Sequence, residues 1–131
     1  MDVDKDRGCF VCGPENTSGL QAVFSCDKEL LQSFCRLTIG DQFQGWQDIV
    51  HGGVIASLLD EACIYAGRAL AETLMTAELS VRYRKPVSVG QEVTIQGEVV
   101  ERRRKVLRVK ARLEAAGELC AEADAKLFLL S

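Results

Sequence analysis

The chain of 131 residues contains 16 basic and 19 acidic residues, and 47% of its residues are hydrophobic. This content can fill one core but hardly two, so we expect a single domain over residues 1–131, with residues 1–19 as a turn segment packed on it. The formal net charge of −3 excludes a strongly basic protein, and we therefore expect neither nucleic acid nor a membrane as a partner.

The N-terminus is charged and no apolar run follows it, so the sequence has no pattern of a signal or transit peptide. We therefore expect a cytoplasmic protein. The longest apolar stretch, residues 54–64, is interrupted by Asp60 and Glu61 and is too short to span a bilayer. Without an export signal, the six cysteines are expected to be reduced thiols rather than a disulfide framework.

Cys9 and Cys12 form the one cysteine pair whose spacing is typical of metal or redox sites. A structural zinc needs four ligands, but the chain has no second Cys-x-x-Cys pair and only one histidine, His51. The turn-like sequence at residues 13–16 favours a cysteine-containing turn over a redox motif. We therefore expect no metal and no cofactor, with zinc shared across a dimer as the alternative.

In chain order, the predicted elements are two strands, one helix and four more strands. Alternation predicts strands at residues 20–25 and 30–39, and a loop follows in which Phe43 and Trp46 are the expected anchors. From residue 54 to 66, apolar side chains occur at nearly every helical angle, which predicts a helix wrapped by the rest of the protein. The last four strands are predicted at residues 77–84, 92–100, 106–113 and 119–130.

One architecture satisfies both the buried helix and the alternating strands. A curved antiparallel sheet, in which the last four strands can pair as a meander, wraps around one long central helix. This α+β arrangement is the hotdog fold.

The residues that could take part in catalysis lie at the start and in the middle of the predicted helix. Gly52 and Gly53 would let a carbonyl approach the backbone, where unpaired N–H groups and the helix dipole suit a developing oxyanion. The alternative is a pair of glycines that serve only a tight turn. A carboxylate in an apolar helix is costly unless it is paired or functional. Asp60 and Glu61 cannot face the same side, because adjacent helical residues are ~100° apart.

The segment His51-Gly52-Gly53-x6-Asp60 resembles the HGG-x6-D motif of hotdog thioesterases of the PaaI and 4-hydroxybenzoyl-CoA (Arthrobacter-type) branch. Residues 43–50 and 75–86, on either side of the helix, also resemble that group. The N-terminal Cys9-Phe10-Val11-Cys12-Gly13, with Ser18-Gly19-Leu20, is similar to the N-terminus of some members. The resemblance implies hydrolysis of an acyl-CoA thioester to a free acid and coenzyme A.

The resemblance also implies roles for individual residues. Gly52 would be the main oxyanion donor, and Asp60 the nucleophile or the general base toward water. Glu61 would be a structural partner, and His51 would position the loop around the helix start. Thr76 would assist the carboxylate and orient water; its alternative is an ordinary β-branched residue at a strand start.

Substrate contacts are expected around the same segment, with Gly53 beside the thioester. Many relatives carry Asn or Gln six residues before the histidine, where this chain has Gly45, and Gln44 or Gln47 is the expected replacement. The basic groups available to coenzyme A phosphates are Arg82, Arg84, Lys85 and the run at residues 102–105, for which a solvated turn is the alternative.

The helix also makes a prediction about assembly. Asp60 lies eight residues beyond Gly52, which is ~12 Å along the axis, yet both must reach one thioester carbonyl. Two antiparallel helices in a C2 homodimer can supply both groups, as the resemblance implies, and a dimer of dimers (homotetramer) is a further option. The alternative function is an acyl-CoA-binding protein of the same fold without turnover.

Overall fold

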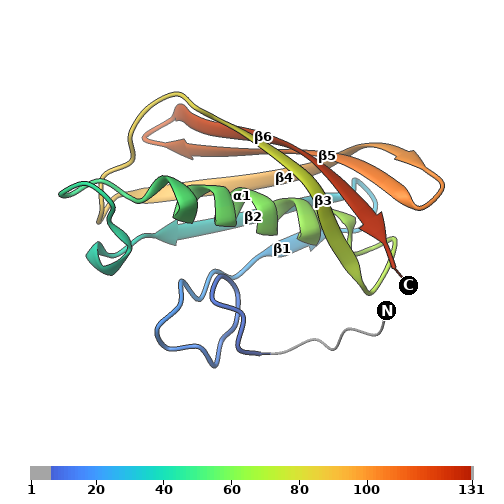
Figure 1. The fold of residues 1–131 in the computed structure, drawn as a ribbon, viewed down its shortest axis with the longest axis horizontal. Coiled ribbons are helices and arrows are strands. Elements are labelled where there is room, and N and C mark those ends of the chain that lie inside the picture. The colour runs from blue at the N-terminus through green and yellow to red at the C-terminus, as the bar shows by residue number, and fades with distance from the viewer. Residues whose placement is uncertain (1–6, 131) are drawn as a thin grey trace.

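The computed structural model describes residues 7–130, and it consists of one helix packed on a six-stranded antiparallel sheet (Figure 1). The long helix is α1 (Gly52–Gly67), and a short 3-10 helix, η1 (Asp41–Phe43), precedes it. This architecture confirms the predicted α+β hotdog fold. The strands are β1 (Ser25–Asp27), β2 (Gln32–Thr38), β3 (Leu74–Tyr83), β4 (Glu92–Arg103), β5 (Val106–Ala115) and β6 (Glu118–Leu129).

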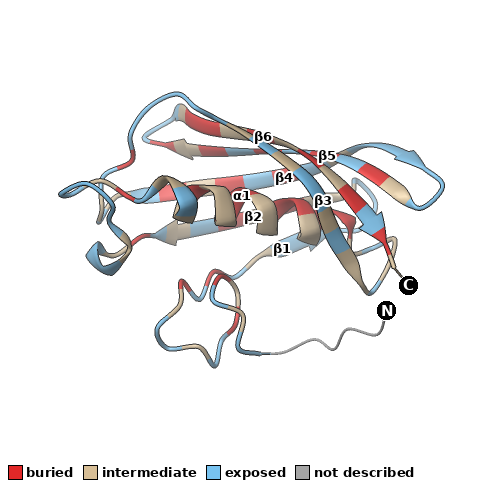
Figure 2. Ribbon diagram, in the orientation of Figure 1, coloured by how far each residue is buried: buried red, intermediate tan, exposed pale blue. Residues whose placement is uncertain are grey.

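Helix α1 buries one face against the sheet and leaves another face accessible (Figure 2). The accessible face contains Gly53, which is exposed, and Ser57 and Asp60, which are half-buried; these residues follow each other at helical spacing. The sheet thus curves around the helix as predicted, with every strand in contact with α1, and within the single chain it leaves the face with Asp60 uncovered. The buried face comprises Ile55, Leu58, Leu59, Ala62, Cys63, Ala66 and Gly67.

The closest approach of α1 to the sheet occurs at Gly97 in β4. A Cβ atom at this position would lie 2.3 Å from the backbone carbonyl oxygen of Ala62. The buried hydroxyl of Ser33, in β2, donates a hydrogen bond of 2.6 Å to the same carbonyl. A glycine is required here because backbone atoms of the helix occupy the space that any side chain would fill.

The order of the strands in the sheet is β1-β2-β4-β5-β6-β3. The predicted four-strand meander is therefore only partly correct: β4, β5 and β6 form it, whereas β3 pairs with β6. Both edges of β4 are occupied, by β2 and by β5, so β3 has no place beside it. The long connection from β3 to β4 is instead bound to the loops before α1, through Val87 O with Val50 N (2.8 Å) and Gly90 N with Ile39 O (2.7 Å).

The segment predicted as the first strand, residues 20–25, is mostly not in the sheet. Leu20 N donates to Phe10 O and Ala22 N to Val11 O, each at 2.8 Å, so this segment pairs with the cysteine-containing turn. Leu20 and Ala22 are buried, which accounts for the alternation in the sequence. Alternate residues are thus buried here although the segment pairs with no strand of the sheet. Strand β1 begins only at Ser25.

The loop that leads into α1 has one anchor rather than two. Phe43 is half-buried and packs against the core, but 84% of the surface of Trp46 is exposed. The prediction that Trp46 anchors this loop is therefore wrong within one chain. Among residues 7–130, no helix is both long and apolar enough to cross a membrane.

We predict that Gly97→Ala destabilises the fold by about 1–3 kcal/mol, the usual cost of overpacking, because the new Cβ meets backbone rather than a movable side chain. Chemical denaturation followed by circular dichroism measures this difference. Gln96→Ala, at the exposed neighbouring position, is the control and should change the free energy of unfolding by less than about 0.5 kcal/mol. Equal stabilities of the two variants would contradict the tight contact.

Candidate active site

Of the two glycines in the first turn of α1, one has a satisfied and the other a free backbone N–H group. His51 is the N-cap residue, and its Nδ1 accepts a hydrogen bond of 2.8 Å from Gly53 N–H. Within residues 7–130, the N–H of Gly52 has no hydrogen-bond partner. Of the two glycines, Gly52 is therefore the one whose donor is available to an incoming oxygen atom.

The hydrogen bond from Gly53 also decides what the imidazole of His51 can do. A nitrogen that accepts a hydrogen bond carries no proton, so the ring is neutral and its proton lies on Nε2. Neither nitrogen is then free to take a proton from water. This geometry favours the positioning role of His51 over that of a general base.

Two further contacts hold the helix start in place. The hydroxyl of Tyr83, at the end of β3, donates to Gly52 O at 2.7 Å. On the other side, a Cβ atom at Gly45 would lie 3.2 Å from both Cα and Cδ2 of His51, so a larger residue would press on the histidine. No sequence pattern pointed to Tyr83, because an exposed tyrosine at a strand end has no distinctive signature.

Many relatives carry an amide side chain at the position of Gly45, and this loop has two glutamines that could replace it. The Oε1 atom of Gln44 accepts a hydrogen bond of 3.1 Å from Asp48 N, which commits this oxygen to the loop. Gln47 is exposed, and no hydrogen bond reaches its side chain from the described residues. Of the two glutamines, Gln47 is therefore the one whose side-chain oxygen and nitrogen are both available to a substrate.

The carboxylate of Asp60 is bound to Thr76 by a short hydrogen bond. Thr76 Oγ1 donates to Asp60 Oδ1 at 2.5 Å, a length typical of a hydroxyl bound to an ionised carboxylate. Thr76 lies inside β3, at a register shift between Thr76 and Glu78, and such bulges re-aim side chains. No hydrogen bond from residues 7–130 reaches Oδ2 of Asp60, so this oxygen remains available for chemistry.

Glu61 points to a different part of the structure, as its position next to Asp60 requires. Its carboxyl group accepts from the thiols of Cys12 at 3.4 Å and Cys9 at 3.9 Å. Burial raises the pKa of Glu61, and the nearby charge of Asp60 raises it further. Burial also raises the pKa of the Cys12 thiol, to about 12. The two adjacent carboxyl groups therefore have separate partners and separate surroundings.

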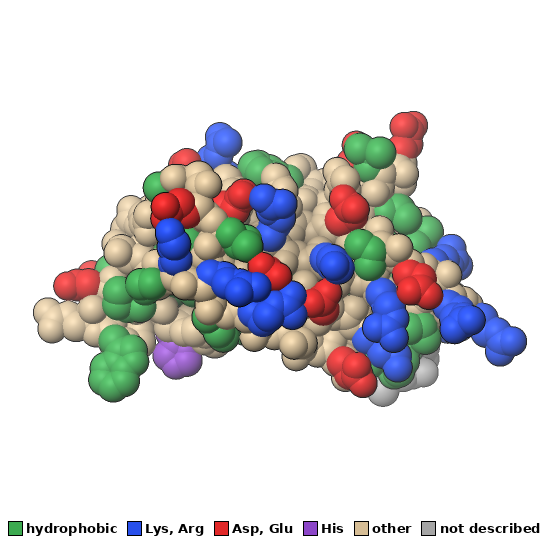
Figure 3. Space-filling model, turned by 90° about the horizontal axis from the view of Figure 1, so that it is seen from above, with side chains coloured by type: hydrophobic (Ala, Val, Ile, Leu, Met, Phe, Trp, Pro, Cys, Tyr) green, Lys and Arg blue, Asp and Glu red, His purple; other side chains and the backbone are tan. Residues whose placement is uncertain are grey.

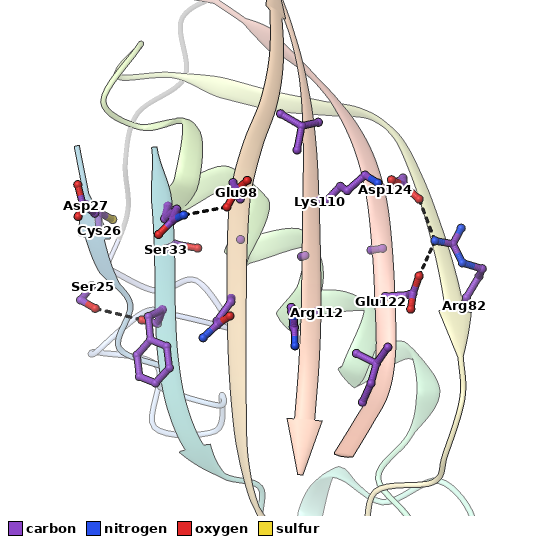
Figure 4. A pocket seen from close by; sticks show the side chains of 18 residues that line it. Ser25, Cys26, Asp27, Ser33, Arg82, Glu98, Lys110, Arg112, Glu122 and Asp124 are labelled. Atoms are coloured by element: carbon purple, nitrogen blue, oxygen red, sulfur yellow. Dashed lines mark hydrogen bonds and ion pairs between the residues drawn. The ribbon is translucent and has the colours of Figure 1, made fainter. Parts of the chain in front are cut away.

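Three of the basic residues predicted to contact phosphate form ion pairs on the surface of the sheet, and those of Arg82 are drawn in Figure 4. Arg82 binds Glu122 at 2.7 Å and Asp124 at 3.1 Å, and the first of these contacts is the main reason that the pKa of Glu122 is lowered. Arg84 lies 3.5 Å from Glu122, and Lys85 binds Glu118 at 2.8 Å. Within one chain, these three residues are not brought together with Asp60.

A broad hollow of about 680 Å³ lies over the outer face of the sheet, away from α1 (Figure 4). Its walls include Arg82, Lys110 and Arg112 together with the acidic Glu98 and Glu122, and it does not contain Asp60. On the face drawn in Figure 3, basic and acidic side chains are interspersed rather than gathered into a patch of one sign. This hollow is therefore distinct from the site around Asp60.

Comparison with known proteins places this geometry in a family. A family model described as the thioesterase superfamily matches residues 47–121. Acyl-coenzyme A thioesterase THEM4 of Bos taurus is 27% identical over 90 residues, which are 69% of this chain and 37% of the relative. The chain thus spans well under half the length of that relative.

Solved structures resemble the whole fold. A crystal structure of a thioesterase superfamily protein has a TM-score of 0.84 and 28% identity, covering 94% of this chain and 60% of that one. A phenylacetic acid degradation-related protein from Ralstonia eutropha JMP134 has a TM-score of 0.78 and 24% identity, covering 84% and 86%. A Streptococcus mutans UA159 protein bound to acetyl CoA has a TM-score of 0.76 and 21% identity, covering 84% and 87%. Because the family match extends over more than half of the sequence and includes Gly52, Asp60 and Thr76, the chain belongs to the thioesterase superfamily.

Proposed function

We propose that the protein hydrolyses acyl-CoA thioesters to a free acid and coenzyme A, at sites that combine Asp60 of one chain with Gly52 of a second copy. The observation that carries the proposal is the Asp60 carboxylate on the accessible face of α1, with one oxygen held by Thr76 and the other without a partner among residues 7–130. Family membership and the acyl-CoA thioesterase relative support the reaction class.

Hydrolysis requires an attack on the thioester carbonyl and loss of the thiolate. In one route, Asp60 Oδ2 attacks the carbonyl carbon, the C–S bond breaks, and water then hydrolyses the mixed anhydride. In the other, Asp60 takes a proton from water, which attacks directly. In both routes Thr76 keeps Oδ1 in place, and the thiolate of coenzyme A leaves and takes up a proton. Negative charge develops on the carbonyl oxygen, where the free N–H of Gly52 would stabilise it.

A second copy of the chain is needed because the two groups are too far apart on one helix. Gly52 and Asp60 are separated by ~12 Å along the axis. If two α1 helices pack antiparallel about a two-fold axis, Gly52 of each approaches Asp60 of the other, and residues midway between them face their own copies. Those residues are Ala56 and Ser57, whose small side chains permit a close approach.

Strand β3 offers a second surface for the same dimer. It is the last strand of the sheet and pairs only with β6 among the described strands, so its other edge has free backbone groups. Met75, beside Thr76, has 40% of its surface exposed. Pairing of two β3 edges would cover these groups and place the two copies of α1 on the same side of a continuous sheet.

The coenzyme A part of the substrate has candidate partners near the helix start. Arg82 and Arg84 flank Tyr83, whose hydroxyl binds Gly52 O, so the end of β3 lies beside the oxyanion donor. These side chains and Lys85 could exchange their acidic partners for phosphates. Gly53 and Gln47 would contact the substrate near the thioester. The Streptococcus mutans neighbour bound to acetyl CoA supports this ligand class.

The direct test is release of free thiol from a panel of acyl-CoA substrates, followed over many turnovers. Steady release with a preferred acyl group is the expected result. Binding of acyl-CoA without turnover by the folded protein would instead favour a non-catalytic acyl-CoA-binding protein.

We expect Asp60→Asn to lower kcat by at least about 1,000-fold while the protein stays folded, because the change removes the charge and keeps the shape. The matched variant is Glu61→Gln, for which we expect less than about a tenfold loss of kcat, because this carboxyl faces the cysteines. Steady-state thiol release measures both. A larger loss at Glu61 than at Asp60 would show that the wrong carboxylate was assigned.

Thr76→Ala should reduce kcat by about 10- to 100-fold, since a hydrogen bond to a charged group contributes about 1.5–3 kcal/mol. KM should change little, because the hydroxyl contacts the carboxylate rather than the substrate. Thr76→Ser, which keeps the hydroxyl, should restore most of the rate. An unchanged kcat in Thr76→Ala would make Thr76 an ordinary strand residue.

Subunit exchange tests the shared site. Gly52→Pro deletes the proposed oxyanion donor, and proline is tolerated at the first position of a helix. His51, with φ −59° and ψ 134°, already has the conformation that a following proline requires. Homodimers of Gly52→Pro and of Asp60→Asn should each be inactive. Mixed dimers should recover up to about half of the native activity, because one of their two sites contains neither change.

Size-exclusion chromatography and circular dichroism must first show that both variants fold and form dimers, and differently tagged chains must show that they exchange. If exchange occurs and no activity returns, the site is contained within one chain.

A further inference from the structure

We propose that Cys9, Cys12 and Glu61 form a binding site for one zinc ion that ties the N-terminal segment to α1. This proposal is independent of thioester hydrolysis, because it concerns a different set of side chains. The sequence favoured a plain turn here, since only two ligands could be recognised along the chain. The folded structure supplies the third ligand from 49 residues further on.

The three ligand atoms already converge. One atom of each residue, the two thiol sulfurs and a carboxylate oxygen, lies within 4.8 Å of the other two. The shortest contacts are 3.4 Å from Cys12 Sγ to Glu61 Oε1 and 3.9 Å from Cys9 Sγ to Glu61 Oε2. In a tetrahedral zinc site with Zn–S of ~2.3 Å and Zn–O of ~2.1 Å, sulfur and oxygen are ~3.6 Å apart. The two observed contacts, which reach different oxygens of the carboxylate, lie on either side of this value.

The cysteine turn is arranged to support a negatively charged sulfur. The backbone N–H groups of Val11 and Cys12 both point to Cys9 Sγ, at 3.4 and 3.5 Å. Hydrogen bonds of this kind stabilise a thiolate, which is the form that binds a metal. The turn is tight at Gly13, where only a glycine fits. A Cβ atom there would lie 2.4 Å from Cys9 N and 2.5 Å from Arg7 O.

The contacts of Glu61 without a metal are weak for a carboxyl group in a partly buried site. Thiols are poor hydrogen-bond donors, and one of the two contacts is as long as 3.9 Å. Removal of a carboxylate from water is costly unless strong donors or a cation replace the lost hydration. A divalent cation between Glu61 and two thiolates would satisfy all three groups at once.

The chemistry of the ligands selects the ion. Two thiolates and one carboxylate favour zinc, whereas magnesium and calcium prefer sites made only of oxygen atoms. Three protein ligands leave the fourth tetrahedral position to a water molecule.

The position of the site indicates that the ion would join two segments of the chain, although its fourth ligand would be water rather than the fourth side chain of a usual structural zinc site. Val11, inside the cysteine turn, is buried in the core, and Leu20 and Ala22 hydrogen-bond back to this turn. An ion that joins the turn to Glu61 would therefore fix residues 7–22 on the outer side of α1. Asp60 faces Thr76 instead, so the ion would not contact the reacting atoms.

The test uses the full chain, purified with reductant, stripped by a chelator and reloaded with Zn²⁺ or with Co²⁺ as a spectroscopic probe. We expect one equivalent of zinc per chain and a higher Tm for the zinc-loaded form. Co²⁺ should give the sulfur-to-metal charge-transfer and ligand-field absorption of a tetrahedral site with thiolate ligands.

Matched variants identify the ligands. Cys12→Ser and Glu61→Gln should weaken zinc binding by more than the roughly 10- to 100-fold that loss of an outer-shell partner costs. They should also abolish the rise in Tm. Cys26→Ser, at an exposed cysteine in β1, and Glu78→Gln, at an exposed glutamate in β3, should bind zinc like the native chain.

Three results would overturn the proposal. The first is a folded, reduced native chain that binds no zinc in a saturable manner. The second is undiminished zinc binding by both Cys12→Ser and Glu61→Gln. The third is equal loss of binding in Cys26→Ser, which would indicate non-specific thiol coordination. Because Glu61→Gln changes no cysteine, it keeps the test decisive if Cys12→Ser fails to fold.

Discussion

The contact between α1 and the sheet is the constraint on which the other features depend. Leu58, Leu59 and Ala62 are buried, and the carbonyl of Ala62 lies against the backbone of Gly97. Because this contact is between backbone atoms, the helix can neither rotate nor shift without a clash. The direction of every other side chain on α1 follows from this fixed rotation. Two adjacent carboxyl groups therefore face different partners, Thr76 for one and the cysteine turn for the other.

The surroundings of each carboxyl group fit the role proposed for it. The hydroxyl that binds Asp60 is a strong donor to one oxygen and leaves the second oxygen accessible, which suits a group that must react. Among the described residues, the carboxyl group of Glu61 receives hydrogen bonds only from thiols, which satisfy a carboxylate poorly and bind a soft metal well. Burial raises the pKa of Glu61, and the proposed zinc ion would stabilise its charged form. The same helix would thus carry the proposed reactive carboxylate and the proposed zinc ligand at adjacent positions.

The sequence predicted the parts of this structure that depend on local patterns. The apolar helix with glycines at its start, and the strands β2, β4, β5 and β6, follow from spacing alone, and the resemblance of residues 51–60 selected Asp60. Long-range placement could not be predicted in the same way. The alternation in β3 is the same whether it pairs with β4 or β6, and the alternation at residues 20–25 reflects burial without a ladder. The contact between Glu61 and Cys12 joins residues far apart in sequence.

A single chain leaves three features of the site incomplete, and they lie on one side of the molecule. The helix face with Asp60 is accessible, the outer edge of β3 is unpaired within the described chain, and the free N–H of Gly52 is ~12 Å from the carboxylate along α1. In a monomer, each of these three features would have to be completed in a different way. In the proposed dimer, one two-fold axis between the α1 helices would pair the edges, cover the helix face and bring each donor to the other chain's carboxylate. Assembly and catalysis would then depend on the same contact, so neither could be lost without the other.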